Sequence, residues 1–142
     1  MTLKQKGFSP AFFWPVALAT VIAVASGRSD VAGPSIIGID KAIHFAVFGL
    51  LGTLVCRLHP DLRGAWLAWV AVSAFGAIDE WHQSFTPGRV AEVADWIADT
   101  LGAALGVALY FQWPRYRALL ERPLFQNRRI ENPALVTTIS GS

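Results

Sequence analysis

Acidic, basic and imidazole side chains gather between residues 79 and 99, in a sequence that is otherwise strongly apolar. Apolar runs of about 65–78 and 97–111 lead into this stretch and out of it. Groups of these types can bind anions, hold a cation or transfer protons, whereas burying them beside lipid is costly and indicates function. The candidate functional residues in this stretch are Asp79, Glu80, His82, Gln83, Arg89, Asp95 and Asp99.

The composition indicates a one-domain integral membrane protein. The chain has 142 residues, of which 54% are hydrophobic and 15% charged; a soluble domain has about 45–50% apolar and about 25% charged residues. The mean hydropathy is +0.43 and the net charge is +2. Five of the twelve cations follow Trp113, and such a cluster sets orientation or contacts anionic lipid. No nucleic-acid recognition motif is present, so we expect no nucleic-acid partner.

Four apolar runs predict an all-α fold, a four-transmembrane-helix up-and-down bundle. Each run approaches the roughly 20 residues that cross a bilayer core as a helix, and none alternates with the period of two that a barrel strand requires. Gly102 and Gly106 form a Gly-xxx-Gly face for helix packing. We expect a membrane domain over residues 1–113 and a basic, partly disordered cytoplasmic tail over 114–142. The predicted helices cover about residues 11–26, 39–58, 65–81 and 93–113.

The first run has a second interpretation. A basic head, a modest apolar run and the small residues Ala23, Val24 and Ala25 also resemble a signal peptide with its cleavage site. We favour a retained helix, because it places Lys4 and Lys6 on the same side of the membrane as the basic tail.

The positive-inside rule places both termini of such a bundle in the cytoplasm. One side of the four spans holds nine cations, which are Lys4, Lys6, Arg57, Arg63, Arg115, Arg117, Arg122, Arg128 and Arg129. The other side holds three, Arg28, Lys41 and Arg89, together with the polar stretch. The polar stretch is therefore expected to face outward.

Three of the predicted helices carry ionisable groups to one depth. His44, Asp79 and Asp99 lie thirteen to fifteen residues from the cytoplasmic ends of their helices, which is roughly 20–23 Å at 1.5 Å per residue. Each of them shares its helix face with a polar residue four positions away. These residues are Asp40 for His44, Gln83 for Asp79 and Asp95 for Asp99. We expect a polar layer below the outer surface, with a mouth lined by Asp40, Glu80, Gln83, Arg89 and Asp95.

Negative charge exceeds positive charge in this layer. Two cations, Lys41 and Arg89, face five carboxylates, which belong to Asp40, Asp79, Glu80, Asp95 and Asp99. Carboxylates are not left unpaired and ionised in a medium of low dielectric constant. Some must therefore be protonated, or a histidine must be charged, or a cation must be bound.

Two non-catalytic interpretations are open. In one, the polar side chains only cap and join the helices; Asp40 and Asp95 lie near helix N-termini, where anions are favoured. In the other, Lys41 and Arg89 hold an anionic head group while the acids accept hydrogen bonds from its donors. The ligand-binding candidates are Asp40, Lys41, His44, Asp79, Glu80, Gln83, Arg89, Asp95 and Asp99.

A catalytic interpretation is also open. His44 or Glu80 would act as general acid or base, and a divalent ion would be held by imidazole and carboxylate ligands. The metal candidates are His44, Asp79, Asp95 and Asp99. The sequence identifies no particular cofactor.

The spacing of these residues resembles the VanZ-like family of small bacterial membrane proteins, which is associated with resistance to glycopeptide antibiotics of the teicoplanin type. The resemblance covers roughly residues 39–110. The family often has asparagine where this chain has Asp99. The matching pieces are Asp40-Lys41-xx-His44-Phe45, Asp79-Glu80-xx-Gln83, Pro87-Gly88-Arg89 and Asp95-xxx-Asp99-xx-Gly102-xxx-Gly106.

The resemblance implies a multi-pass protein of the bacterial inner membrane, with an extracytoplasmic site near cell-wall precursors. We expect that site to bind a cell-envelope lipid head group or the glycopeptide itself, and hence to be associated with antibiotic resistance. Two alternatives stay open: an intramembrane metal-dependent or acid–base enzyme acting on lipid-linked phosphates, and a structural membrane scaffold. The expected partners are membrane lipids, together with a lipid-linked cell-wall precursor or a glycopeptide.

Overall fold

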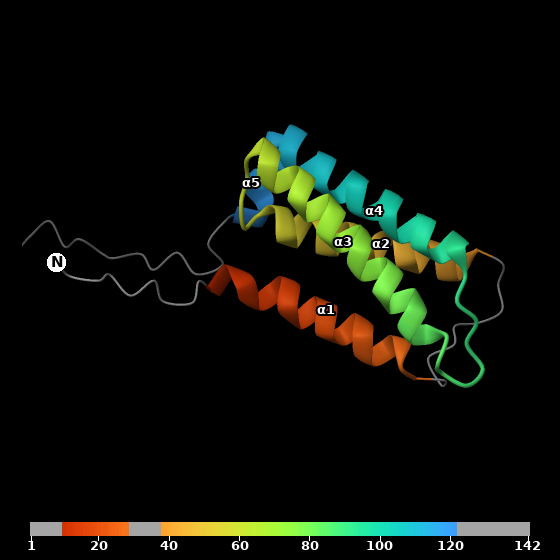
Figure 1. Cartoon of the computed structure of the whole chain (residues 1–142). Coiled ribbons are helices and arrows are strands. Elements are labelled where there is room, and N and C mark those ends of the chain that lie inside the picture. Colours follow the sequence, from red (N-terminus) through yellow and green to blue (C-terminus); the bar gives the residue numbers. More distant parts are fainter. Residues whose placement is uncertain (1–9, 29–37, 122–142) are drawn as a thin grey trace, which may run out of the picture.

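The computed structural model describes residues 10–28 and 38–121, and within these ranges the fold is all-helical. Figure 1 shows α2, α3 and α4 side by side, with α1 along one side of them and α5 at one end. The elements are η1 (Pro10–Phe12), α1 (Phe13–Ser26), α2 (Ile39–Cys56), α3 (Leu62–Gln83), α4 (Val93–Gln112) and α5 (Pro114–Glu121).

The four long helices agree with the four predicted runs to within three residues at every end. The largest difference is at α3, which begins early because Asp61 caps it: the Asp61 side chain accepts a hydrogen bond from the Gly64 backbone N–H at 2.6 Å. The predicted basic tail begins with an ordered helix, α5. The rest of that tail and the basic head lie outside the described residues.

The closest helix contact joins α2 and α4. Gly102 lies against the carbonyl of Phe45, and Gly106 lies against the carbonyl of Gly49, so that a β-carbon at either position would overlap the oxygen. Thr53 of α2 donates a hydrogen bond to the Gly106 carbonyl at 3.1 Å. The Gly-xxx-Gly face therefore acts in packing, as its spacing predicted.

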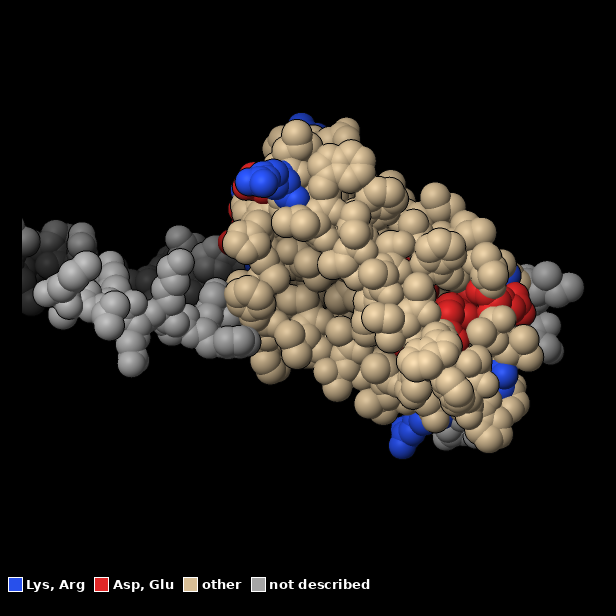
Figure 2. All heavy atoms as spheres, viewed as in Figure 1, with Lys and Arg blue, Asp and Glu red and all other residues tan. Residues whose placement is uncertain are grey.

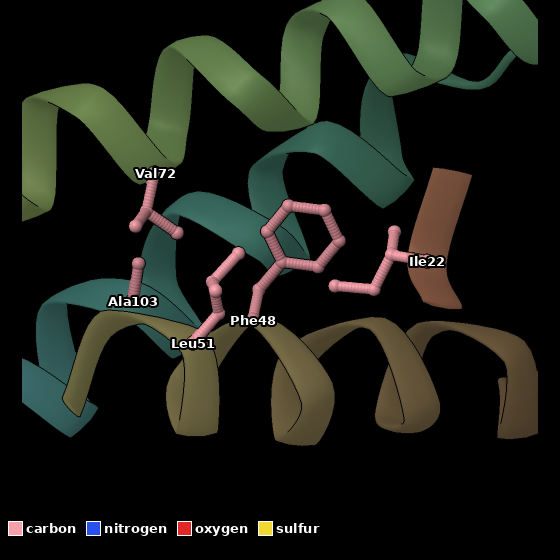
Figure 3. Packing of buried hydrophobic residues seen from close by; sticks show 5 residues of the cluster. All are labelled: Ile22, Phe48, Leu51, Val72 and Ala103. Atoms are coloured by element: carbon pink, nitrogen blue, oxygen red, sulfur yellow. The ribbon is translucent and has the colours of Figure 1, made fainter. Parts of the chain in front are cut away.

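Two apolar clusters fill the bundle. The first, shown in Figure 3, takes one or two side chains from each of the four long helices: Ile22, Phe48, Leu51, Val72 and Ala103. The second lies toward α5 and contains Cys56, Ala65, Ala68, Val107 and Tyr110, against which Tyr116 and Leu120 of α5 pack. Both α1 and α5 thus contribute to the packed structure.

The outer surface of the bundle is largely apolar between its two ends. Figure 2 shows the charged atoms of the viewed face gathered toward the ends, and large side chains such as Leu67 (69% exposed) cover the surface between. Two helices, α2 and α4, are long and apolar enough to cross a membrane. α1 is apolar but has 14 residues, about 21 Å of helix. α3 is longer but carries Arg63, Asp79 and Glu80. Two of the four predicted spans therefore have the length and apolarity of a membrane helix.

Candidate functional site

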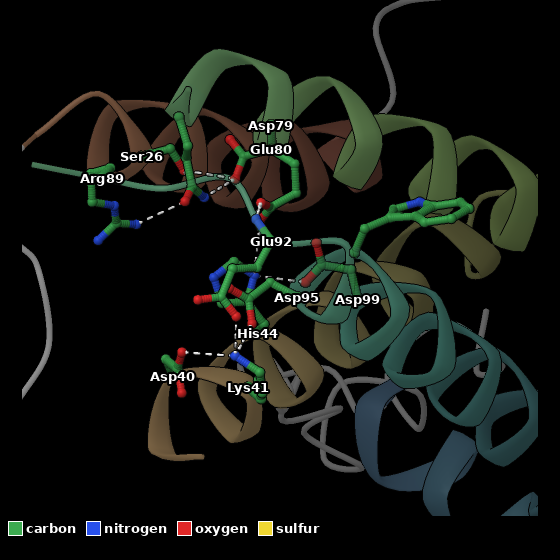
Figure 4. Close-up of polar contacts among 12 residues, drawn as sticks. Ser26, Asp40, Lys41, His44, Asp79, Glu80, Arg89, Glu92, Asp95 and Asp99 are labelled. Carbon is green, nitrogen blue, oxygen red and sulfur yellow. Dashed lines mark hydrogen bonds and ion pairs between the residues drawn. The ribbon is translucent and has the colours of Figure 1, made fainter. Parts of the chain in front are cut away.

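The polar residues gather at one end of the bundle, where α2 and α4 begin and where α1 and α3 end. Acidic atoms form a compact patch at this end in Figure 2, and Figure 4 shows their contacts. The residues form three groups, which we name by their central side chain: the histidine cluster, the lysine cluster and the serine cluster.

The histidine cluster consists of His44, Glu80 and Asp99, one residue from each of α2, α3 and α4. His44 Nδ1 lies 2.9 Å from Asp99 Oδ1 and 4.0 Å from Glu80 Oε1. Asp99 is fully buried and Glu80 is 6% exposed. One candidate ligand atom from each residue lies within 4.8 Å of the other two. Three helices thus bring an imidazole and two carboxylates into a space that one ion or one polar group could fill.

Two neighbours fix this geometry. Gly76 of α3 lies beside Asp99, and a β-carbon there would lie 2.9 Å from Asp99 Oδ2, so glycine leaves room for the carboxylate. The ring of Phe48, one turn from His44, stacks against the imidazole with centroids 6.2 Å apart and planes 7° apart. Because Phe48 also belongs to the first apolar cluster, it separates the polar site from the core.

The lysine cluster lies at the mouth of the site and joins the start of α2 to the start of α4. Lys41 Nζ lies 3.1 Å from Asp40 Oδ2, 2.8 Å from Glu92 Oε2 and 3.0 Å from Asp95 Oδ1. Figure 4 shows the lysine between these acids. Three carboxylates therefore already share this ammonium group, which leaves it poorly placed to hold an anionic head group.

The serine cluster joins α1 to α3 and to the connection that follows α3. Ser26 Oγ donates a hydrogen bond to Asp79 Oδ2 at 2.7 Å, and Gln83 Nε2 donates to the same oxygen at 3.1 Å. Arg89 Nη2 in turn donates to Gln83 Oε1 at 3.2 Å. Among the described residues Arg89 forms no ion pair. The four-residue spacing of Asp79 and Gln83 correctly placed them together.

The structure gathers only part of the metal set named from the sequence. Asp79 belongs to the serine cluster and Asp95 to the lysine cluster, while Glu80 lies beside His44 and Asp99. The physical reason is helix geometry. Asp79 and Glu80 are consecutive, so their side chains point about 100° apart; Asp79 faces α1 and Glu80 faces α2 and α4.

Two members of the site have no counterpart among the predicted residues, Ser26 and Glu92. Glu92 immediately precedes α4, its side chain contacts Lys41, and its backbone N–H donates to Glu80 Oε2 at 3.0 Å. An acid directly before a helix is a recognisable signal, because the positive end of the helix dipole favours it. Ser26 is the last residue of an apolar helix. It could have been identified only because α1 and α3 of an up-and-down bundle end on the same side, which places Ser26 at the depth of Asp79.

Acceptors exceed donors in the site. Among the described residues, four buried carboxylate oxygens have no hydrogen-bond partner: Asp79 Oδ1, Glu80 Oε1, Asp95 Oδ1 and Asp99 Oδ2. Asp95 Oδ1 is nevertheless compensated, because it lies 3.0 Å from Lys41 Nζ. The other three face no lysine or arginine among the described residues. Since an unsatisfied buried acceptor is costly, the arrangement is suited to a cation or to a ligand rich in hydrogen-bond donors.

The described residues thus define a class: a small all-helical bundle that has two membrane-compatible helices and an acid–imidazole site at one end. The model of the VanZ/LLP1 family matches residues 5–116, and the chain belongs to this family. The match contains every residue of the three clusters and confirms the resemblance found in the sequence. Comparisons with curated proteins and with solved structures gave no match.

Proposed function

We propose that this member of the VanZ/LLP1 family is a four-span protein of the bacterial cytoplasmic membrane whose polar site faces outward. The site binds a donor-rich group of the cell envelope, either the head group of a lipid-linked cell-wall precursor or a glycopeptide. Occupation of the site lowers the effect of the antibiotic, which connects the protein with resistance.

The observation that carries this proposal is the excess of buried acceptors. Asp79, Glu80 and Asp99 each present a carboxylate oxygen for which the described part of the chain supplies no hydrogen-bond donor. The two proposed ligands share the chemistry that these oxygens require, because both carry amide N–H groups and sugar hydroxyl groups that donate hydrogen bonds. Arg89 donates a hydrogen bond to Gln83. Its guanidinium has further N–H groups, which can donate to an acceptor atom of the ligand.

The distribution of cations supports the outward orientation. Arg57, Arg63 and Arg115 lie toward the end of the bundle opposite the three clusters, which the positive-inside rule assigns to the cytoplasm. Exposed tryptophans lie toward both ends, such as Trp66 on one side and Trp81 on the other, as expected of membrane interfaces. The three residues of η1 and the fourteen of α1 together reach seventeen, the lower limit of about 17–25 for a span.

The test is antibiotic susceptibility in a sensitive bacterium that expresses the protein. We expect the wild-type chain to lower susceptibility to glycopeptides of the teicoplanin type, and Asp79→Asn, Glu80→Gln and Arg89→Ala to remove most of this effect. Glu121→Gln, at the opposite end of the bundle, is the matched control and should behave as wild type. Membrane abundance is measured for each variant by immunoblot.

Two outcomes would contradict the proposal. In one, wild-type protein and empty vector give the same susceptibility. In the other, all three site variants protect as well as wild type at equal abundance, while their melting temperatures fall. This second outcome would indicate that the clusters act only as a structural scaffold.

The second candidate function is an intramembrane enzyme acting on lipid-linked phosphates. It is favoured by one contact, that of His44 with Asp99, because a carboxylate that orients an imidazole is a common arrangement in acid–base catalysis. Glu80 lies beside this pair and could serve as the second acid or base. Purified protein that releases phosphate from polyprenyl phosphates, and loses this activity in His44→Gln, would support it; no turnover by wild type would exclude it.

A further inference from the structure

We propose that the histidine cluster binds one divalent first-row transition metal ion, with His44 Nδ1, Glu80 Oε1 and an oxygen of Asp99 as ligands. The inference goes beyond the proposed function, because it concerns an ion resident in the site rather than the cell-envelope ligand. The ion would use the carboxylates of Glu80 and Asp99, on which the proposed function also rests, but it is tested by metal binding to the purified protein in the absence of any antibiotic.

The separations of the candidate ligand atoms fit a single ion. Zinc binds histidine nitrogen and carboxylate oxygen at about 2.0–2.2 Å, so that two ligands of one ion are separated by about 3–4 Å. His44 Nδ1 lies 2.9 Å from Asp99 Oδ1 and 4.0 Å from Glu80 Oε1. A small adjustment of side chains, without movement of the helices, would place all three around one centre.

The orientation of Glu80 is the second, independent observation. Its Oε2 accepts the backbone N–H of Glu92 at 3.0 Å, which holds the carboxylate in place. Its Oε1 faces His44 and has no hydrogen-bond partner within residues 10–28 and 38–121, and the residue is buried, with 6% of its surface exposed. A fixed, buried carboxylate oxygen without a donor is costly, and a bound cation removes this cost.

The charge balance points in the same direction. Lys41 is shared by the three acids of the lysine cluster, and Arg89 bonds to an amide rather than to an acid. Glu80 and Asp99 therefore have only His44 as a possible positive neighbour among the described residues. A divalent ion would neutralise both carboxylates and leave the imidazole neutral, which is the form that binds metals.

The ligand types indicate which ions fit. Imidazole suits zinc, iron and other first-row transition ions, and carboxylates also suit manganese, whereas magnesium and calcium prefer oxygen ligands alone. Three protein ligands leave at least one coordination position for water or a guest, as in catalytic rather than structural zinc sites. We therefore expect Zn²⁺ or Mn²⁺ to bind more tightly than Mg²⁺.

The experiment measures metal binding to the full chain, purified in detergent and stripped with a chelator. After incubation with Zn²⁺ or Mn²⁺ and gel filtration, mass spectrometry of the elements should find about one ion per chain. Glu80→Gln, Asp99→Asn and His44→Gln should each weaken binding tenfold or more, since loss of even a hydrogen-bond partner of a ligand costs about 10–100-fold. The matched control is Glu121→Gln, which removes an acid at the opposite end of the bundle and should bind as wild type.

A second measurement does not depend on the folding of the acidic variants. Electron spin echo spectroscopy of the Mn²⁺-loaded wild type should detect one coordinated imidazole nitrogen, which His82→Gln retains and His44→Gln removes. The proposal is overturned if neither ion is retained by the wild type. It is equally overturned if Glu80→Gln and Asp99→Asn bind as tightly as wild type, or if the bound Mn²⁺ shows no nitrogen coupling.

Discussion

His44 Nδ1 and Asp99 Oδ1 lie 2.9 Å apart, although 55 positions separate the two residues in the sequence. Each has a neighbour in the closest helix contact of the fold: Phe45 follows His44, and Gly102 lies one turn beyond Asp99, with its backbone against the Phe45 carbonyl. The geometry of the polar site therefore depends on how closely α2 and α4 pack.

Gly102→Ala tests this dependence. The added β-carbon would overlap a backbone oxygen that no side-chain rotation can move, and such overpacking costs typically about 1–3 kcal/mol. We expect a lower melting temperature by tryptophan fluorescence in detergent. Leu105→Ala, on the exposed face of the same helix, is the control and should melt close to wild type. Equal melting temperatures for Gly102→Ala and wild type would show that the contact is looser than described.

Replacing Asp99 separates the role of the acceptor from that of the charge. Asp99→Asn keeps an oxygen that can accept a hydrogen bond from His44, so we expect a small loss of unfolding free energy. Asp99→Leu leaves Nδ1 of the half-buried His44 without its hydrogen-bond partner, which costs up to about 1–3 kcal/mol. Denaturant titration of both proteins in the same detergent measures the difference. Equal losses in the two variants would mean that the hydrogen bond contributes nothing.

Acid should loosen α5. The hydroxyl of Tyr110 donates to Glu121 Oε1 at 2.5 Å, and Arg117 Nε lies 3.1 Å from the same oxygen. The Tyr110 hydrogen bond, followed by the Arg117 contact, holds the pKa of Glu121 below its ordinary value of 4.5. A lowered pKa in the folded state stabilises α5 above that value, and this stabilisation is lost as the pH falls through the lowered pKa.

Amide hydrogen exchange of α5 measures the effect. After correction for intrinsic exchange rates, protection of Pro114–Glu121 should be constant from pH 7 to about 5 and should fall below about pH 4.5. Glu121→Gln should show weak protection at every pH, because the charged acceptor is missing. Wild-type protection that does not change with acid would mean that packing of Tyr116 and Leu120 alone holds α5.

Lys41 should weaken the binding of a cation next to it. Its ammonium group lies 3.0 Å from Asp95 Oδ1, at the mouth of the site. Lys41→Gln removes this positive charge and should tighten Mn²⁺ binding by the histidine cluster, most clearly at low salt, where charges at a partly exposed mouth are least screened. Titration of stripped protein measures the affinity, with Arg115→Gln at the opposite end as control. Unchanged or weaker binding in Lys41→Gln alone would contradict this electrostatic coupling.

The sequence predicted that His44 and Asp99 lie at a similar depth, and because α2 and α4 begin at the same end of the bundle and pack together, the two side chains meet. Which of two consecutive acids would join them was not predictable. α3 is apolar on several faces, so the sequence leaves its rotation undefined, and only packing decides that Glu80 rather than Asp79 faces α2 and α4.

Contacts made by the ends of the helices could also not be predicted from the sequence. Ser26 and Glu92 join the site because α1 ends and α4 begins beside it. The basic composition of the tail likewise gave no sign that α5 would pack on Tyr110 and Cys56. The boundaries of the four long helices were predictable to within three residues, because apolar length and polar turns determine them.

The central claim is that the acid–imidazole site opens toward the outside of the cell, and thiol labelling of intact cells tests it most directly. The variants are made in a Cys56→Ala background, which removes the single native thiol. Val90→Cys places a thiol in the exposed connection beside the site, and Arg115→Cys places one at the opposite end of the bundle. The account predicts that a membrane-impermeant maleimide labels Val90→Cys in intact spheroplasts, and labels Arg115→Cys only after the membrane is opened. Labelling of Arg115→Cys from outside, with Val90→Cys protected until lysis, would contradict it.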